Sequence, residues 1–409
     1  MFKKICLIIV IILLLIFVAY SAEIDDFIDL SQKDILRMKI SEYLHYIKTN
    51  PPLDRLYRQG DTCFFLRNDQ KLFLLKMQSL CSSQQYPSEL NSTTTQPFSE
   101  GDINGFYHNY RETEEMLQDL AARYPDLTEL FSIGQSIEGR ELYVIKISDH
   151  AAIEEYDEEP NIYIVGCHHA REWISVEVPL LFIQYLLENY ATNPYVKRAV
   201  DGAQIYIQPI QNPDGLEFSI HTYRFWRKNR RYNGNLSWGV DPNRNYGYQW
   251  GYDDIGSSSD PDSGIYRGSS PFSEPECAAV RDFLLAHPPS GSLSFHNYSQ
   301  AIIYPWGYKR QPTVDNEEMA QIAEEMSNRI FQVNGRLYTF GLDPLGYPTN
   351  GGTNDWIYGT FRTPSFTIEL PPQYAVFGGF FTSEEMIDSA FSENLPAMLY
   401  FVNYFIQDI

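Results

Sequence analysis

The stretch Gly166-Cys-His-His-Ala-Arg-Glu-Trp173 lies between two apolar runs of different length. The run 161–165 before it predicts a buried strand, and the run 174–187 after it predicts a helix. Such strand-to-helix junctions are where α/β enzymes place reacting groups. His169 and Glu172 are three residues apart, so in a helical turn their side chains share one face. A neutral imidazole and a carboxylate on one face can hold a divalent metal, and zinc is the usual choice for that pair.

The spacing of this pair says little by itself. In 409 residues with 8 His and 53 acidic residues, chance predicts about one His with an acid three residues later, and one occurs. The alternative is a strand-end His beside a solvated Glu. A catalytic zinc also needs three protein ligands and an open position. His296 ends the predicted strand 293–296 and can supply the third ligand, although a lone His at a strand end is more often a core residue.

The pattern of apolar runs changes at about residue 105 and then alternates between strand and helix types. The predicted strands are 142–147, 161–165, 204–209, 293–296, 302–304 and 365–370, and the predicted helices are 110–124, 176–190, 273–286, 315–333 and 383–406. This alternation predicts an α/β domain, with helices on both faces of a sheet. Ligands of such folds bind at the carboxyl ends of strands. The polar residues at or near these ends are His169, Asn212, His296 and Glu369.

Residues 1–21 have the composition of a secretory signal peptide. Lys3 and Lys4 precede the apolar run 5–19, and Ala19 and Ser21 fit the −3 and −1 positions of a cleavage site after Ser21. We therefore expect a secreted or otherwise extracytoplasmic protein. The alternative is an uncleaved anchor, although the run is short for a membrane span.

The region between the signal peptide and the α/β domain divides into two parts. Residues 22–81 are predicted to form a small, mainly helical region. Apolar residues recur there at helical spacing, at Leu36, Ile40, Leu44 and Ile47. Residues 82–104 are rich in Ser, Thr, Gln, Asn and Pro, and they are predicted to be a polar linker.

Charge and cysteine content restrict the possible partners and chemistry. The net charge of −22 disfavours nucleic acids and anionic membranes as partners, since both require basic patches. A disulfide between Cys63 and Cys81 would close a short loop, and the sequence leaves this pairing open. Cys167 and Cys277 are predicted to be small buried side chains. A nucleophilic Cys167 paired with a histidine is the alternative.

Seven ordered motifs in the α/β region resemble those of the zinc carboxypeptidase A/B family. In chain order they are His169-Ala-Arg-Glu172, Asn212-Pro-Asp-Gly215, Arg224-Phe-Trp-Arg227, Gly239-Val-Asp241-Pro-Asn243-Arg244-Asn245, Ser294-Phe-His296-Asn-Tyr298, Tyr347 with Gly351-Gly352, and Phe366-Thr-Ile-Glu369. The segment 133–140 also resembles the one that opens the family's catalytic domain. The resemblance covers about 105–409. It implies a zinc carboxypeptidase catalytic domain with a central mixed eight-stranded sheet and helices on both faces.

The resemblance also implies a metal centre and a general base. His169, Glu172 and His296 would bind one Zn²⁺ per chain and leave a position for water, whose pKa zinc lowers to about 7. Asp241 would orient the ring of His169 by a hydrogen bond. Glu369 would take the proton of the zinc-bound water as it attacks and pass it to the leaving amine.

Further residues match the positions with which the family holds its substrate. Arg227 would polarise the scissile carbonyl. The residues that match the grip on the substrate's terminal carboxylate are Asn243, Arg244 and Tyr347. Accessory substrate-binding positions are matched by Arg171 and Tyr298. The remaining cations Arg224, Arg230 and Arg231 are interpreted as solvated side chains.

Asn354 matches the family position at the base of the side-chain pocket, where an aliphatic residue suits apolar substrates and an Asp suits Lys or Arg. Other matched pocket residues are Ser294, Ile303, Gly307, Leu342 and Thr349. An uncharged pocket does not neutralise a buried substrate cation, which costs several kcal/mol to desolvate. We therefore expect a preference for neutral C-terminal residues, apolar or polar.

The sequence as a whole predicts a secreted zinc carboxypeptidase that acts on peptides or proteins with free C-termini. We expect a monomer without stable membrane association once the signal is removed. Residues 22–104 have about the length of the family's inhibitory N-terminal domain, and a propeptide role for 22–81 is one interpretation. The alternatives are a peptidoglycan stem-peptide carboxypeptidase of the same fold and an inactive relative used as a binding protein. The chain retains Glu369 and the ligand set that an inactive relative usually loses.

Overall fold

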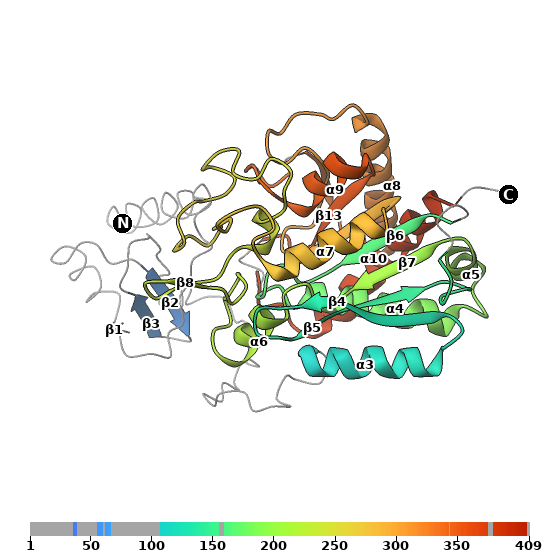
Figure 1. The fold of residues 1–409 in the computed structure, drawn as a ribbon, viewed down its shortest axis with the longest axis horizontal. Helices are drawn as coiled ribbons and strands as arrows, with labels where there is room; N and C mark the ends of the chain where they lie inside the picture. Colours follow the sequence, from blue (N-terminus) through green and yellow to red (C-terminus); the bar gives the residue numbers. More distant parts are fainter. Residues whose placement is uncertain are drawn as a thin grey trace, which may run out of the picture. The chain divides into compact units, whose positions relative to one another are not determined.

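The computed structural model describes residues 36–38, 55–59, 62–66, 107–154, 159–342, 344–374 and 379–406 (Figure 1). The chain divides into two compact units, Met1–Pro97 and Phe98–Ile409. The predicted signal peptide 1–21, the linker 82–104 and the Cys63–Cys81 pairing lie outside what is described.

The first unit contains a three-stranded antiparallel sheet. Its order is β1 (Leu36–Met38), β3 (Thr62–Leu66) and β2 (Arg55–Gln59). The strand β1 begins at Leu36, where the sequence predicted a helix, so the helical prediction is wrong for these three residues. The other described residues of the predicted helical region, 55–59 and 62–66, are also strands, so the helical prediction is wrong for every described part of 22–81.

The second unit is built around a mixed eight-stranded sheet, as the sequence predicted. Its strands, in spatial order, are β12 (Thr339–Gly341), β11 (Ala301–Ile303), β13 (Ser365–Leu370), β10 (Gly291–Asn297), β6 (Asn161–Val165), β7 (Gln204–Gln208), β5 (Glu141–Ile147) and β4 (Thr128–Gln135). The four central strands β13, β10, β6 and β7 are parallel. Every residue of β6, β7 and β10 is buried. Strands covered on both faces have this burial, which explains their continuous apolar runs.

Helices pack on both faces of this sheet, which confirms the predicted architecture. Their bounds are α3 (Tyr110–Arg123), α4 (Ile174–Asn189), α5 (Pro194–Asp201), α6 (Pro213–His221), α7 (Pro275–Ala286), α8 (Asn316–Asn334), α9 (Thr353–Phe361) and α10 (Glu385–Tyr404). Alternate residues of β6 join different hydrophobic clusters. Ile162 packs in a cluster with α4, α8 and α10, and Tyr163 packs in one with α7 and α9. Figure 1 shows α7 in front of the strands and α10 behind them.

The sequence missed several short elements. The helices α5, α6 and α9 contain eight or nine residues, too few for periodicity to distinguish them from other apolar segments. The helix α6 begins at Pro213 and is capped by Asn212, whose side chain accepts from the backbone N–H of Gly215. Asn-Pro-Asp-Gly also has the composition of a turn, which concealed this helix. The strand β12 has three residues, two of them exposed.

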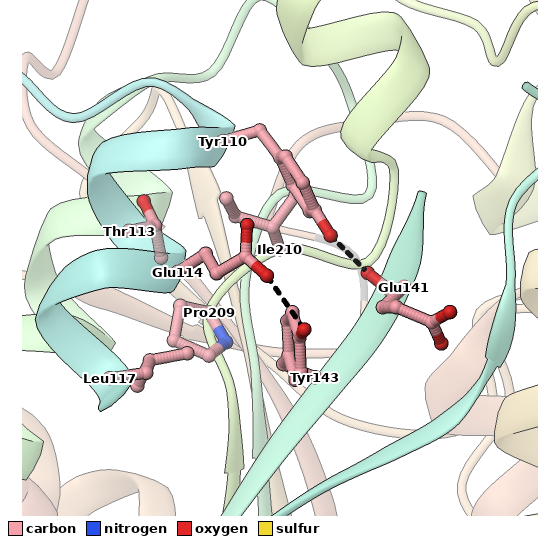
Figure 2. A pocket seen from close by; sticks show the side chains of 8 residues that line it. All are labelled: Tyr110, Thr113, Glu114, Leu117, Glu141, Tyr143, Pro209 and Ile210. Atoms are coloured by element: carbon pink, nitrogen blue, oxygen red, sulfur yellow. Dashed lines mark hydrogen bonds between the residues drawn. The ribbon is translucent and has the colours of Figure 1, made fainter. Parts of the chain in front are cut away.

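None of the helices in the described part of the chain has the length and apolar character needed to cross a membrane. A small cavity of about 10 Å³ lies between α3, β5 and the segment 209–210 (Figure 2). Within its lining, Tyr110 donates to the carbonyl of Glu141 at 3.1 Å, and Tyr143 donates to the carboxylate of Glu114 at 2.6 Å. The cavity has room for about one water molecule. Its lining includes no residue of the predicted site, so it is a packing feature of α3.

Candidate active site

Three candidate metal ligands converge at the carboxyl ends of β6 and β10. His169 and Glu172 lie in the turn between β6 and α4, where Glu172 N–H donates to the carbonyl of His169 at 3.1 Å. His296 is the sixth residue of β10. One ligand atom from each residue lies within 4.8 Å of the others, and all three side chains are buried.

The donor atoms of this cluster face one another. The Nδ1 atoms of His169 and His296 are 3.0 Å apart, and each is 2.9 Å from an oxygen of Glu172. Two imidazole nitrogens and a carboxylate directed at one point are the donor set that zinc prefers, so these residues fit the metal. Burial raises the pKa of Glu172, but the two rings and their hydrogen bonds lower it further, and the net pKa lies well below its usual range.

The far side of the His169 ring contacts a buried carboxylate. Nε2 of His169 lies 3.2 Å from Oδ1 of Asp241, the arrangement that orients a metal-binding imidazole. Burial opposes ionisation of Asp241, but Arg227, His169 and Arg244 hold its pKa well below the usual range. Nε of Arg227 donates to Oδ2 of Asp241 at 3.0 Å, and Nη2 of Arg227 lies 3.0 Å from the same oxygen. Nη1 of Arg227 lies 3.8 Å from Oε1 of Glu172. The structure therefore brings Arg227 to the edge of the metal cluster.

Asn243 and Arg244 belong to the short helix η2 (Pro242–Arg244), which follows Asp241. The side chain of Asp241 accepts from the backbone N–H of Asn243 at 2.9 Å. Nδ2 of Asn243 lies 3.4 Å from Nε2 of His296. Arg244 is buried, with hydrogen bonds from Nε to the carbonyl of Gly256 and from Nη1 to that of Asn243. Tyr347, predicted to work with them, lies on the loop between β12 and α9 and is 41% exposed.

Glu369 and His296 are neighbours across two parallel strands. Their Cα atoms are paired in the register of β13 with β10, so both side chains leave the same face of the sheet. Glu369 is half-buried, whereas the other residues of β13 are buried. The only strand residue of β13 with access to solvent is therefore the predicted general base.

Asn354 lies at the start of α9 and contacts the same strand. Its Nδ2 donates to the hydroxyl of Thr367 at 2.8 Å and to the carbonyl of Ile303 at 3.3 Å. Ser365 donates to its carbonyl oxygen at 3.4 Å. Thr367 and Ser365 alternate with residues of the opposite face, so they share the face of Glu369. The Asn354 side chain is thus held by uncharged groups near the predicted base.

The accessory positions Arg171 and Tyr298 meet at a residue that the sequence did not single out. The guanidinium of Arg171 lies 4.1 Å from the ring centroid of Phe380, and the ring of Tyr298 is 4.9 Å from it. Arg224 donates to the carbonyls of Arg171 and Phe380. Its guanidinium lies 3.6 Å from the ring of Trp173, and burial lowers its pKa to about 9. The interpretation of Arg224 as a solvated cation is therefore wrong.

Cys167 and Cys277 are free and fully buried, as predicted. Burial raises the pKa of the Cys167 thiol above its usual value, with a smaller contribution from the charge of Glu172. A buried thiol of raised pKa is a poor nucleophile. The alternative of a cysteine nucleophile is therefore not supported by this geometry.

Comparison with known proteins agrees with this fold. Residues 113–397 match the family model for zinc carboxypeptidases, and the chain belongs to this family. It is 34% identical to a zinc carboxypeptidase of Saccharothrix mutabilis subsp. capreolus over 73% of the chain and 69% of that relative. It is also 34% identical to carboxypeptidase A1 of Rattus norvegicus and to carboxypeptidase B of Astacus astacus. Each of these matches covers 64% of the chain, with 62% of the rat protein and 86% of the crayfish protein.

Solved structures show the same fold. Bovine thrombin-activatable fibrinolysis inhibitor, in complex with tick carboxypeptidase inhibitor, superposes with a TM-score of 0.66 at 33% identity, over 73% of this chain and 97% of the other. Carboxypeptidase A of Helicoverpa armigera superposes with a TM-score of 0.66 at 29% identity, over 73% of each chain. The chain is therefore a zinc metallocarboxypeptidase of the carboxypeptidase A/B type.

Proposed function

We propose that this protein is an extracytoplasmic carboxypeptidase that removes one neutral residue at a time from the C-termini of peptides and proteins. The observation that supports this most is the His169–Glu172–His296 cluster, with Glu369 beside His296 on the adjacent strand and Arg227 beside Glu172. A metal-dependent hydrolytic site of this kind combines a metal position, a base and a cation within reach of one carbonyl group.

The proposed chemistry assigns one task to each side chain. When bound, zinc polarises the substrate carbonyl and increases the acidity of water. The carboxylate of Glu369 accepts a proton from the water that adds to the scissile carbonyl, and later delivers it to the leaving amine nitrogen. The guanidinium of Arg227 donates to the carbonyl oxygen as negative charge develops there. Asp241 holds both Arg227 and the His169 ring in place.

Recognition of the chain end is assigned to Asn243, Arg244 and Tyr347. An arginine suits this task because its fork of donors can bind a carboxylate bidentately. Since an internal peptide bond has no carboxylate at this distance, such a grip restricts cleavage to the last residue. The preference for neutral residues rests on Asn354 and on the hydroxyls of Thr367 and Ser365 that surround it.

Asp355 is the acid nearest to Asn354 in the sequence, but its carboxylate is engaged elsewhere. It accepts from the backbone N–H groups of Gly307 and Tyr308 at 2.9 Å each. Burial raises its pKa to about 6, so it is still mostly ionised at neutral pH, but its charge is directed at these two backbone groups. This agrees with a neutral preference.

Activity on a blocked tripeptide with a free C-terminus tests the proposal. We expect release of the last residue, loss of activity with a chelator and recovery on adding zinc. Absence of release from any peptide would favour the inactive binding protein. Release from peptidoglycan stem peptides alone would favour the cell-wall enzyme.

Export is a separate part of the proposal and rests on the composition of residues 1–21. We expect protein recovered outside the cytoplasm to begin at Ala22. N-terminal sequencing of the exported protein measures this directly. Recovery of the full-length chain in the membrane fraction would instead identify residues 1–21 as an anchor.

A further inference from the structure

Behind the metal cluster, five side chains form a closed ring of polar contacts. Nε2 of His296 lies 3.1 Å from the hydroxyl of Ser294, which lies 3.4 Å from Nδ1 of His168. Nε2 of His168 lies 3.0 Å from the hydroxyl of Thr353. Thr353 donates to Oδ1 of Asn243 at 3.0 Å, and Nδ2 of Asn243 lies 3.4 Å from Nε2 of His296.

The direction of one hydrogen bond sets the direction of the others. The hydroxyl proton of Thr353 is directed to Asn243, so the Thr353 oxygen accepts from Nε2–H of His168. Nδ1 of this neutral ring is then an acceptor for the hydroxyl of Ser294. The oxygen of Ser294 in turn accepts from Nε2–H of His296, so the 3.4 Å approach of Nδ2 of Asn243 to this nitrogen is a contact between two donors and not a hydrogen bond. This arrangement leaves the lone pair of His296 on Nδ1, the atom directed at His169 and Glu172.

His168 is buried completely, and its ring contacts side chains of two helices or strands other than its own segment. It belongs to the turn after β6, and its two ring nitrogens reach β10 and α9. Its ring also lies nearly parallel to that of His296, with centroids 5.4 Å apart and an interplanar angle of 17°. A hydrocarbon side chain could fill the same space, but it could not connect the two hydroxyl groups.

We propose that His168 is a positioning residue that fixes the tautomer and orientation of His296 through Ser294, and orients Asn243 through Thr353. If the proposed function holds, His168 affects two properties of the site. One is the affinity of the cluster for zinc, and the other is the grip on the substrate's terminal carboxylate. Outer partners of metal-binding histidines typically change metal affinity by about 10–100-fold.

The zinc dissociation constant of the metal-free full chain, measured by competition with a chelating dye, tests the first property without requiring activity. We expect His168→Leu to weaken zinc binding by about 10–100-fold. The matched control is Tyr246→Phe, because Tyr246 contacts the same Nε2 at 3.0 Å but lies outside the ring. We expect zinc affinity and the thermal midpoint of the metal-free protein to stay near native in this control.

Two conservative variants separate the contact of His168 with Ser294 from its contact with Thr353. His168→Asn places an amide near the position of Nδ1 and can keep the contact with Ser294. His168→Gln places one near Nε2 and can keep the contact with Thr353. We expect His168→Asn to keep native zinc affinity and, at saturating zinc, to have a raised KM. We expect His168→Gln to bind zinc more weakly and, at saturating zinc, to have kcat and KM near native.

Native zinc affinity in folded His168→Leu would overturn the proposal. An equal loss in Tyr246→Phe would also overturn it, because the effect would then reflect general loosening of the core. If His168→Leu does not fold, Ser294→Ala decides the matter, since it breaks the ring between His168 and His296. Native zinc affinity in Ser294→Ala would then reject the role assigned to His168. Zinc binding without peptidase activity in the wild-type chain would instead refute the proposed function and leave this test valid.

Discussion

Glu369 stands at a position where strand geometry directs a carboxylate toward the metal cluster. It shares a sheet face with His296 and is half-buried at the end of β13. A strand-end acid in this place could also serve only stability. A substitution that keeps shape and removes charge distinguishes these roles.

We expect Glu369→Gln to lower kcat by at least about 10³-fold, since the base acts on both the water and the leaving amine. Zinc content and the affinity for a carboxylate inhibitor should stay near native, because neither depends on this side chain. Steady-state kinetics with metal analysis measures both. The control is Glu188→Gln, a substitution of an exposed carboxylate on α4. More than about a tenth of native kcat in Glu369→Gln would show that another group is the base.

Arg244 is expected to matter only for substrates that carry a free terminal carboxylate. Arg244→Ala should lower kcat/KM on such peptides by an amount equivalent to about 2–5 kcal/mol, as for other truncated buried charge pairs. Most of the loss should fall on KM. Arg244→Lys, which keeps the charge but not the fork, should be intermediate. The native enzyme should not cleave C-terminally amidated peptides. Equal rates on free and amidated peptides would mean that Arg244 has another role.

The residue at the base of the pocket should set the preferred C-terminal residue. Asn354→Asp places a carboxylate where Thr367 and Ser365 can hydrogen-bond it. We expect the ratio of kcat/KM for C-terminal Lys over Leu to rise by about tenfold or more, because the pocket can then pair with a cation. Asn354→Leu is the neutral control and should leave the ratio low. An unchanged ratio in Asn354→Asp would place the specificity pocket elsewhere.

At the scale of elements, the site is assembled by strand register and by turns. A shift of β13 by one residue relative to β10 would move Glu369 to the opposite face of the sheet. The hydrophobic alternation of β13 resists such a shift, because Phe366 and Ile368 are buried in the larger cluster on the other face. The register that keeps the core together therefore also keeps the base beside His296.

The N-terminus of α7 carries a buried acid that should make stability depend on pH. Glu276 accepts from the backbone N–H of Ile137 and from the amide of Asn229, at 3.2 Å each. Burial, together with the charges of Glu274 and Asp214, raises its pKa from 4.5 to about 7. The folded state thus binds its proton more tightly than the unfolded state. The resulting stability is fully present below about pH 4.5 and is lost as the pH rises to about 7.

We expect Glu276→Gln to remove this part of the pH dependence, equivalent to about 2–3 kcal/mol between pH 4.5 and 7. Urea unfolding followed by tryptophan fluorescence is suited to the measurement, because all six Trp lie between residues 173 and 356. The signal therefore reports only on the second unit. Glu188→Gln should keep the native pH dependence. An unchanged slope in Glu276→Gln would mean that other carboxyls cause it.

At the scale of the whole molecule, the chain consists of two compact units joined near residue 97. The predicted linker 82–104 contains no Lys or Arg, so trypsin cannot cut within it. We expect a protease of broad specificity to cut there first and to release a stable fragment of the second unit. If residues 22–81 are inhibitory, peptidase activity should rise in step with this cleavage. Mass spectrometry and activity assays on the same samples measure both, and unchanged activity after complete cleavage would reject a propeptide role.

The amino-acid pattern was enough to predict the α/β class, the central strands, the longer helices and the three candidate metal ligands. Those features depend on local periodicity and on motifs whose members are close in sequence, such as His169 and Glu172. It did not reveal β4, β12 or the short helices, because their patterns are too brief or too exposed to stand out. The first unit was predicted to be mainly helical, but its described segments are strands, because apolar residues at helical spacing do not exclude a strand.

The contacts between residues far apart in the sequence became visible in the tertiary structure. His168 is 126 residues from Ser294 and 185 from Thr353, yet it contacts both. Phe380 joins Arg171 to Tyr298, and Arg224 donates to backbone carbonyls of two loops. Neither relationship leaves a local signal, because hydrogen-bond partners and ring contacts are selected by strand register and loop packing. The motifs identify the groups that can do chemistry, and the packing of the sheet decides which neighbours hold them in place.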